Sequence, residues 1–148
     1  MEIEFTIKGH QDDPKGNPIP YKRSTQNIKW REDVKRYEAW KKHVRDSLIA
    51  WDFKDESLLR NLARNQLTYR KPLALEKNQK ARMSIMIYWA KENHGDPDNI
   101  WKGIADALFT NDKNVDGSFV SSMAEDGKGR VDVMINTYAN EKHINHRT

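Results

Sequence analysis

Two aspartates that lie two residues apart carry the clearest chemical signal in this sequence. Asp96 and Asp98 stand between an apolar run and a helical pattern, where a strand would pass through a loop into a helix. Carboxylates at this spacing can converge on one hard cation, and Mg²⁺ is often held by one or two carboxylates together with water and a substrate phosphate. Lys102 follows Asp98 by four residues and could neutralise charge on such a phosphate. The pattern predicts metal-dependent phosphate chemistry at this loop.

The same residues also fit a purely structural arrangement. Asp-Pro is a common start of a helix, with Asp96 as the N-cap and Pro97 at the first helical position. Asp98 would then be favoured by the helix dipole, and Lys102 would be its ion-pair partner one turn later. A third carboxylate, Asp112, lies just past the end of the predicted helix and joins the pair only if the chain turns back. The spacing alone leaves both interpretations open.

A competing metal pattern begins at Asp112. Residues 112–117 read D-K-N-V-D-G, which matches the first half of an EF-hand calcium loop. The twelfth position of that loop should be a bidentate glutamate, and here it is Met123. The segment that should form the exiting helix contains two glycines and then alternates like a strand. A calcium-binding module at residues 112–123 is therefore the weaker hypothesis.

Alternating apolar residues predict the strands that would position these groups. Residues 3–7 alternate with polar neighbours, as in a strand with one buried face. Residues 83–89 are largely apolar at both sets of positions, which is typical of a central strand covered on both faces. Two further apolar-leaning runs, 115–123 and 131–135, flank a glycine-containing turn. This last pattern predicts a β-hairpin.

Apolar residues at intervals of three and four predict two main helices. The first begins near Asp33, which could cap it, and runs to Leu48 with Trp40 in the core. Its other face is rich in lysine and arginine. The second helix covers about residues 97–108 and begins at the acidic loop. The two aspartates are thus expected at the start of a short amphipathic helix.

The remaining segments are less regular. Residues 58–67 favour a short helix, and residues 140–148 are expected to form a flexible polar tail. No internal repeat or low-complexity linker divides the chain. The predicted fold is a single mixed α/β (α+β) domain over residues 1–148, with two main helices packed on a small mixed sheet.

Composition and charge limit the class of protein. The chain has 148 residues and no cysteine, which excludes a disulfide framework, a cysteine nucleophile and a thiolate zinc site. No apolar run approaches the ~18 residues of a membrane span, so we expect a cytoplasmic protein that makes no membrane contact. Residues 1–90 carry 19 basic and 12 acidic residues, whereas residues 91–148 carry 7 and 10. This asymmetry suggests a polyanion that is held by the first part and processed at the second.

The acidic loop and its surroundings resemble one known family. Residues 96–102 read D-P-D-N-I-W-K and residues 106–108 read D-A-L, which is similar to the D-x-D-N-x-x-K…D-A-L signature of RusA-type Holliday junction resolvases. Asn111-Asp112 stands where that family has an acidic pair whose second member is catalytic. The specific match covers roughly residues 83–137. Asp116 is an alternative third carboxylate in a different register.

The resemblance implies a homodimeric, Mg²⁺-dependent endodeoxyribonuclease, in which Mn²⁺ could substitute. Such an enzyme resolves four-way or other branched DNA by paired nicks in recombination and repair, and a phage or prophage origin would be common. Asp96, Asp98 and Asp112 would hold the metal, and Lys102 would act at the scissile phosphate. Sequence-independent contacts with the DNA backbone are expected from Lys22, Arg23, Lys29, Arg31, Lys35 and Lys42.

Two alternatives stand beside the nuclease. One is a protein that binds branched DNA without cutting it, because the acidic pair is altered and the connection from the helix to Asp112 is short for the family. The other is the calcium-binding module at residues 112–123. His94, next to the acidic loop, is expected to be an exposed loop histidine.

Overall fold

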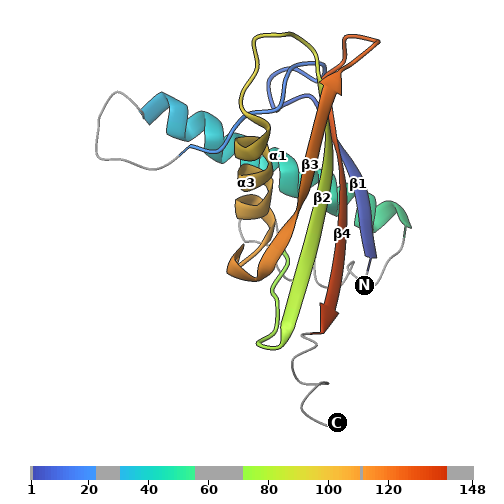
Figure 1. Cartoon of the computed structure of the whole chain (residues 1–148). Helices are drawn as coiled ribbons and strands as arrows, with labels where there is room; N and C mark the ends of the chain where they lie inside the picture. The colour runs from blue at the N-terminus through green and yellow to red at the C-terminus, as the bar shows by residue number, and fades with distance from the viewer. Residues whose placement is uncertain (1, 23–30, 56–71, 111, 140–148) are drawn as a thin grey trace.

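A computed structural model describes residues 2–22, 31–55, 72–110 and 112–139 of the chain. In chain order its elements are β1 (Glu2–Lys8), α1 (Arg31–Asp55), β2 (Gln79–Trp89), α3 (Pro97–Leu108), the 3-10 helix η2 (Asp112–Asn114), β3 (Val115–Met123) and β4 (Arg130–Ala139). The four strands form one sheet in the order β1-β4-β2-β3 (Figure 1). The expected small α+β domain with a mixed sheet and two main helices is confirmed.

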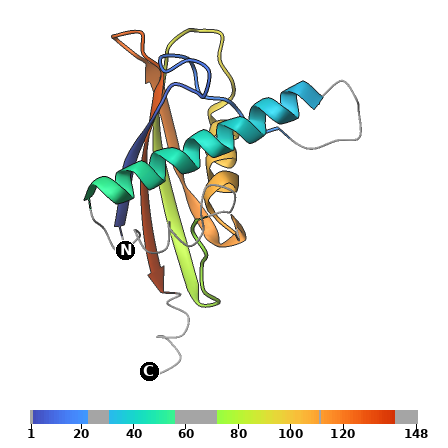
Figure 2. The ribbon, with the colours of Figure 1, turned by 180° about the vertical axis from the view of Figure 1, so that it is seen from behind.

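Both helices pack on one face of the sheet. The inward residues of β1 are Ile3, Phe5 and Ile7, and they join the buried residues of β2, β4, α1 and α3 in one hydrophobic core. α1 crosses the strands obliquely on this face (Figure 2). On the opposite face the side chains of β3 and β4, such as Val120 and Met134, are exposed. The expectation that the central strand β2 is covered on both faces is therefore wrong, because α1 and α3 pack on the same face of the sheet.

The last two strands are not partners in a hairpin. β2 lies between them, and Ile85 pairs with Phe119 of β3 on one side and with Val133 of β4 on the other. β3 runs parallel to β2 because α3 returns the chain to the starting end of the sheet, whereas β4 is antiparallel to β2. The turn at residues 124–129 thus passes over the end of β2. The hairpin prediction was wrong because the most apolar strand takes the central position, where both of its edges are hydrogen-bonded.

The apolar stripe of α1 forms the predicted core contact. Tyr37, Trp40, Val44 and Leu48 are all buried, and the side chain of Trp40 is 0% exposed. The helix begins at Arg31, so Asp33 lies inside its first turn and does not precede it. The predicted helix at residues 58–67 and the tail at residues 140–148 lie outside the described residues. None of the helices in the described part has the length and apolar character that a membrane span requires.

A polar contact fixes α1 against α3. The Tyr37 hydroxyl donates to Asp106 Oδ2 at 2.8 Å, and Lys41 Nζ lies 3.3 Å from the same oxygen. Burial and the bond to the carboxylate raise the pKa of Tyr37, so the phenol remains a donor throughout the physiological range. Asp106, the first residue of the D-A-L segment, therefore connects the two helices.

Candidate functional site

The two aspartates at the start of α3 adopt the structural arrangement that the sequence allowed. Asp96 is the N-cap, and its Oδ1 accepts the backbone N–H of Asp98 at 3.2 Å, while Pro97 stands at the first helical position. Asp98 Oδ2 lies 3.2 Å from Lys102 Nζ, and these side chains are 46% and 53% exposed. The capping and ion-pair predictions are confirmed. The same exposure leaves the carboxylates open to a ligand from solvent.

The third predicted metal ligand lies elsewhere. Asp112 belongs to η2, which follows the C-terminal end of α3, whereas Asp96 and Asp98 stand at its N-terminal end. The 12 residues of α3 span roughly 18 Å at about 1.5 Å each. Asp116 follows the buried Val115 in β3 and faces the side of the sheet that the helices leave uncovered. Within the described ranges, no group of three His, Asp or Glu side chains could hold a metal ion.

The EF-hand hypothesis does not fit the geometry either. The segment that should leave the calcium loop as a helix is the strand β3, and it is paired along its length with β2. Asp112 and Asp116 therefore belong to a 3-10 turn and a strand, and not to a helix–loop–helix unit.

The basic residues expected to contact DNA are only partly described. Lys22 Nζ lies 3.5 Å from Asp33, and Lys42 Nζ lies 2.8 Å from Asp46, so both are ion-paired at the surface. Lys35 is exposed on α1. Arg23 and Lys29, and the side chain of Arg31, are outside the described part of the chain.

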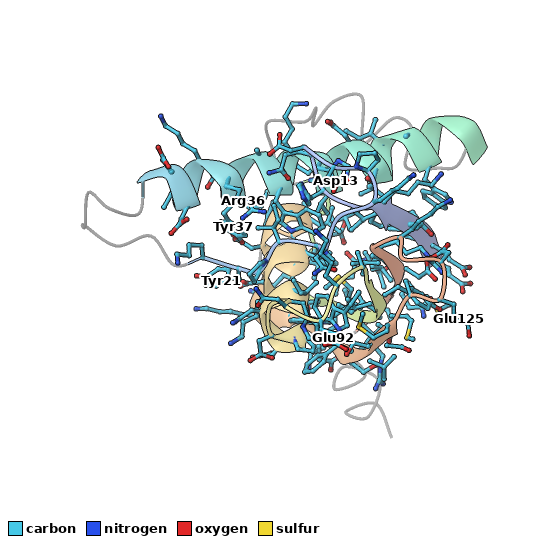
Figure 3. The ribbon with its side chains drawn as sticks, turned by 90° about the horizontal axis from the view of Figure 1, so that it is seen from above. Asp13, Tyr21, Arg36, Tyr37, Glu92 and Glu125 are labelled. Carbon is cyan, nitrogen blue, oxygen red and sulfur yellow. The ribbon has the colours of Figure 1, made fainter. Side chains whose placement is uncertain are left out.

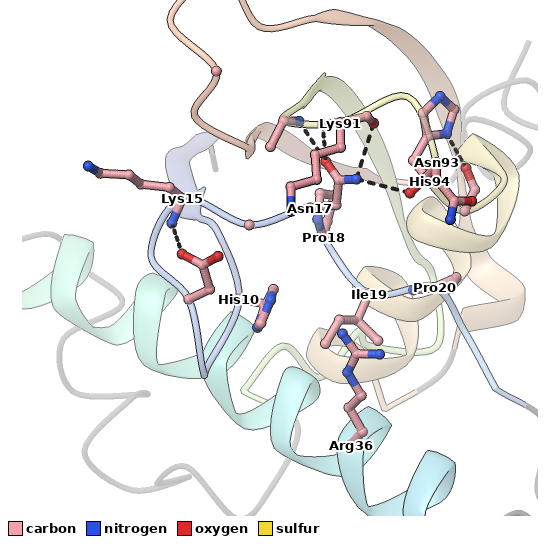
Figure 4. Close-up of a pocket in the computed structure, with 15 residues that line it drawn as sticks. His10, Lys15, Asn17, Pro18, Ile19, Pro20, Arg36, Lys91, Asn93 and His94 are labelled. Atoms are coloured by element: carbon pink, nitrogen blue, oxygen red, sulfur yellow. Dashed lines mark hydrogen bonds between the residues drawn. The ribbon is translucent and has the colours of Figure 1, made fainter.

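A polar cavity next to the start of α3 was not predicted. It has a volume of about 440 Å³ and lies between the loop after β1, the loop after β2 and the N-terminal half of α1 (Figure 4). His10, Arg36, Lys91 and His94 are among its lining residues. Gly95, the residue that precedes Asp96 in the chain, also lines the cavity. These residues are spread over more than eighty positions, so no local motif or periodicity in the sequence indicated the cavity.

Asn17 holds the two loops of the cavity together. Its Oδ1 accepts the backbone N–H groups of Ala90 and Lys91 at 2.6 and 3.2 Å. Its Nδ2 donates to the backbone oxygens of Lys91 and Asn93. The amide thus satisfies backbone groups that the end of β2 leaves without a strand partner.

Backbone contacts extend this anchoring to α3 and to the turn before β4. The N–H of Tyr21 donates to the oxygen of Asn99 at 2.9 Å, which attaches the first loop to the first turn of α3. Gly129 donates to the oxygen of Lys15 and accepts from Gly9. A Cβ at Gly129 would collide with the backbone oxygen of Gly16, so this close approach requires glycine. The cavity wall is therefore fixed relative to the acidic helix start.

Two histidines line the cavity in different ways. The ring of His94 stacks on Trp89, with centroids 3.7 Å apart and planes 3° apart, and its Nδ1 lies 2.8 Å from the oxygen of Gly95. His10 Nδ1 accepts the backbone N–H of Asp12 at 3.1 Å, which leaves Nε2 as the protonated nitrogen of the neutral ring. Burial, and then the nearby Arg36, lower the pKa of His10 below its usual value of 6.5, against the opposing effect of Asp13.

The titration of His10 gives a testable consequence. Its pKa in the folded protein is expected below 6.5, so on acidification the unfolded chain takes up this proton before the folded chain does. The contribution to stability is complete above about pH 6.5 and is lost as the pH falls through the lower, folded value. An NMR titration of the histidine rings gives the pKa directly. Urea unfolding of wild type and His10→Gln between pH 7.5 and 5 should give a difference in the free energy of unfolding that becomes smaller toward acid pH. A measured pKa of 6.5 or more for His10 would contradict this expectation.

No protein-family model matches the sequence, and no curated protein matches it.

Proposed function

We propose that the protein is an endodeoxyribonuclease that depends on Mg²⁺ or Mn²⁺ and acts on branched DNA, four-way junctions in particular. The observation that carries the proposal is the solvent-exposed set of Asp96, Asp98 and Lys102 at the start of α3. The order and spacing of these three residues resemble the signature of the RusA-type resolvases. A cavity rich in basic side chains adjoins the set and offers a place for the DNA strand.

The two carboxylates fit the requirements of a hard divalent cation. Mg²⁺ needs only one or two protein carboxylates when water and substrate phosphate complete its shell. Asp96 uses Oδ1 in the helix cap. Among the described residues the Asp98 carboxylate pairs only with Lys102, and it remains partly exposed. When bound, Mg²⁺ supplies Lewis-acid activation of the phosphodiester and charge neutralisation. Asp112 does not fit this set, because the length of α3 separates it from the pair.

The side chains of this set have separable roles in the proposal. Asp96 and Asp98 hold the cation, and the cap bond keeps the Asp96 carboxylate at the helix start. Lys102 exchanges its partner: when the Asp98 carboxylate turns to a cation, the ammonium group becomes available to a phosphate oxygen as a point charge. In both arrangements the ammonium group keeps an anionic partner.

Paired nicks in a symmetric junction need two equivalent sites. The proposal therefore includes a homodimer with two-fold symmetry, in which each copy presents one α3 start to one strand. It also places the protein in the cytoplasm and leaves room for a phage or prophage origin.

A protein that binds branched DNA without cutting it is the second candidate. The observation in its favour is that, among the described residues, Asp96 and Asp98 have no third carboxylate beside them. In this case Asp96, Asp98 and Lys102 only stabilise the start of α3, through the cap and the ion pair.

A cleavage assay separates the two candidates. The full chain is incubated with an end-labelled four-way junction and with a matched linear duplex, in Mg²⁺ and in chelator. Symmetric nicks in the junction alone, lost in chelator, would support the nuclease. Tight and selective junction binding with no nicks in Mg²⁺ or Mn²⁺ would reject the nuclease in favour of the binding protein.

A further inference from the structure

We infer that the cavity between the loop after β1, the loop after β2 and α1 is a phosphate-binding pocket, and that it holds a backbone phosphate of the DNA strand next to the Asp96–Asp98 pair. Phosphate binding follows from the cavity itself. Its assignment to a DNA strand rests on the proposed function.

The charge of the lining favours an anion. Lys15, Arg36 and Lys91 line the cavity, and in the described part of the chain none of them forms an ion pair. Among the described lining residues the one carboxylate is that of Asp13, whose Oδ1 accepts the backbone N–H of Lys15 at 2.9 Å. The lining therefore has a surplus of positive charge that none of the described residues neutralises, and an anionic ligand would do so.

Arg36 is the residue best placed to select phosphate. Its side chain is exposed and runs from α1 toward the loop after β1, where it lies beside Ile19 (Figure 4). The planar guanidinium offers paired donors that match two phosphate oxygens, which a lysine cannot do. Lys15 contributes less, because its side chain turns away from the space between His10 and Arg36 (Figure 4).

Two further acidic residues at this end of the domain lie away from the cavity. Glu92 and Glu125 belong to the loops at the same end of the sheet but do not line the cavity. In the view from above they lie well away from Arg36, on the other side of the domain end (Figure 3). An approaching phosphate therefore meets Asp13 as the one carboxylate of the described lining, opposite the three basic side chains.

The neutral ring of His10 adds a hydrogen-bond donor. Its Nδ1 is occupied by the N–H of Asp12, so its Nε2–H is directed to the other side of the ring. Asn17, by contrast, has both ends of its amide engaged with the backbone and serves as part of the wall. The binding groups are thus Arg36, His10 and Lys91, on a frame that Asn17 holds in place.

Size and position connect the pocket to the acidic pair. A volume of about 440 Å³ accommodates a phosphate together with its sugar. Gly95 is part of the lining and Asp96 caps α3 directly after it. A strand whose phosphate sits in the pocket would therefore pass the start of α3. Because the wall is held by side-chain and backbone hydrogen bonds, little further ordering is needed on binding.

Inorganic phosphate is the first probe. It is titrated into the metal-free full chain while the imidazole resonances of the five histidines are followed by NMR. Saturable shifts are expected at His10 and His94, and Arg36→Gln should weaken binding about tenfold. The matched control is Lys77→Gln, an exposed lysine in the turn before β2 and outside the cavity, which should bind as wild type does. Phosphate that shifts neither histidine, or that binds Arg36→Gln as tightly as wild type, would overturn the inference.

Branched DNA is the second probe. Affinity for a four-way junction is measured against salt in chelator, where no cleavage can occur. Arg36→Gln should bind about tenfold more weakly, with a salt slope lower by about one, and inorganic phosphate should compete with the wild-type complex. Phosphate that shifts the histidines without competing with DNA would overturn the assignment to a DNA strand. Absence of nicking with both results intact counts against the nuclease and leaves the pocket standing.

Discussion

The Asp98→Asn variant is expected to cut a four-way junction at least about a hundredfold more slowly than wild type, with little loss of junction affinity. Removing the charge weakens one of two carboxylates that the cation needs, and a hundredfold corresponds to about 2.7 kcal/mol of lost transition-state stabilisation. The ion pair with Lys102 is exposed, so its loss should lower the free energy of unfolding by no more than about 1 kcal/mol. Single-turnover nicking rates in Mg²⁺ and a thermal melt measure the two effects separately.

Asp112→Asn is the informative comparison for this experiment. Asp112 is also an exposed aspartate next to α3, but it lies past the C-terminal end of this helix, whereas Asp98 lies at its start. Its substitution should therefore leave the nicking rate within about threefold of wild type, because in the proposal Asp112 does not contact the reacting groups. An equal loss in both variants would show that Asp112 reaches the metal after all, from a second copy or a rearranged chain. An Asp98→Asn enzyme with wild-type rates would remove Asp98 from the mechanism.

Replacement of Trp40 by alanine should have the largest effect on stability. The side chain is 0% exposed and packs in the core between α1 and the sheet. Truncation of a buried tryptophan costs about 3–5 kcal/mol, because apolar contacts are lost and a cavity remains. This is a large share of the 5–15 kcal/mol typical of a domain. Urea unfolding followed by circular dichroism gives the difference in free energy.

Trp40→Phe serves as the control for packing. The indole Nε1 of Trp40 is buried and has no hydrogen-bond acceptor among the described residues, so phenylalanine removes an unsatisfied donor together with part of the ring. The loss should therefore be clearly smaller than for alanine. Trp101→Phe differs, since the indole of Trp101 donates to the oxygen of Met83 at 2.8 Å and its removal leaves that acceptor without this bond. Equal destabilisation by Trp40→Phe and Trp40→Ala would contradict the packing argument.

The positions of the elements could be predicted from the sequence because each is set by nearby residues. A helix buries residues three and four apart, which is why the stripe from Tyr37 to Leu48 identified α1 and placed Trp40 in the core. The start of α3 was equally local, since the cap bond joins Asp96 to Asp98 and the ion pair joins Asp98 to Lys102. The set of Asp96, Asp98 and Lys102 could be identified in the same way, because its three residues lie within the helix cap and the first turns of α3.

The arrangement of the elements was decided only by the tertiary structure, because it depends on which distant segments compete for the same edge. The turn at residues 124–129 looked like a hairpin, but β2 pairs with both flanking strands and excludes that contact. Asp112 is near Asp98 in the sequence and yet stands at the other end of α3, because a helix of 12 residues lies between them. The basic cavity could not be foreseen, since Asn17 joins it to Lys91 across more than seventy residues and periodicity carries no information about such pairs.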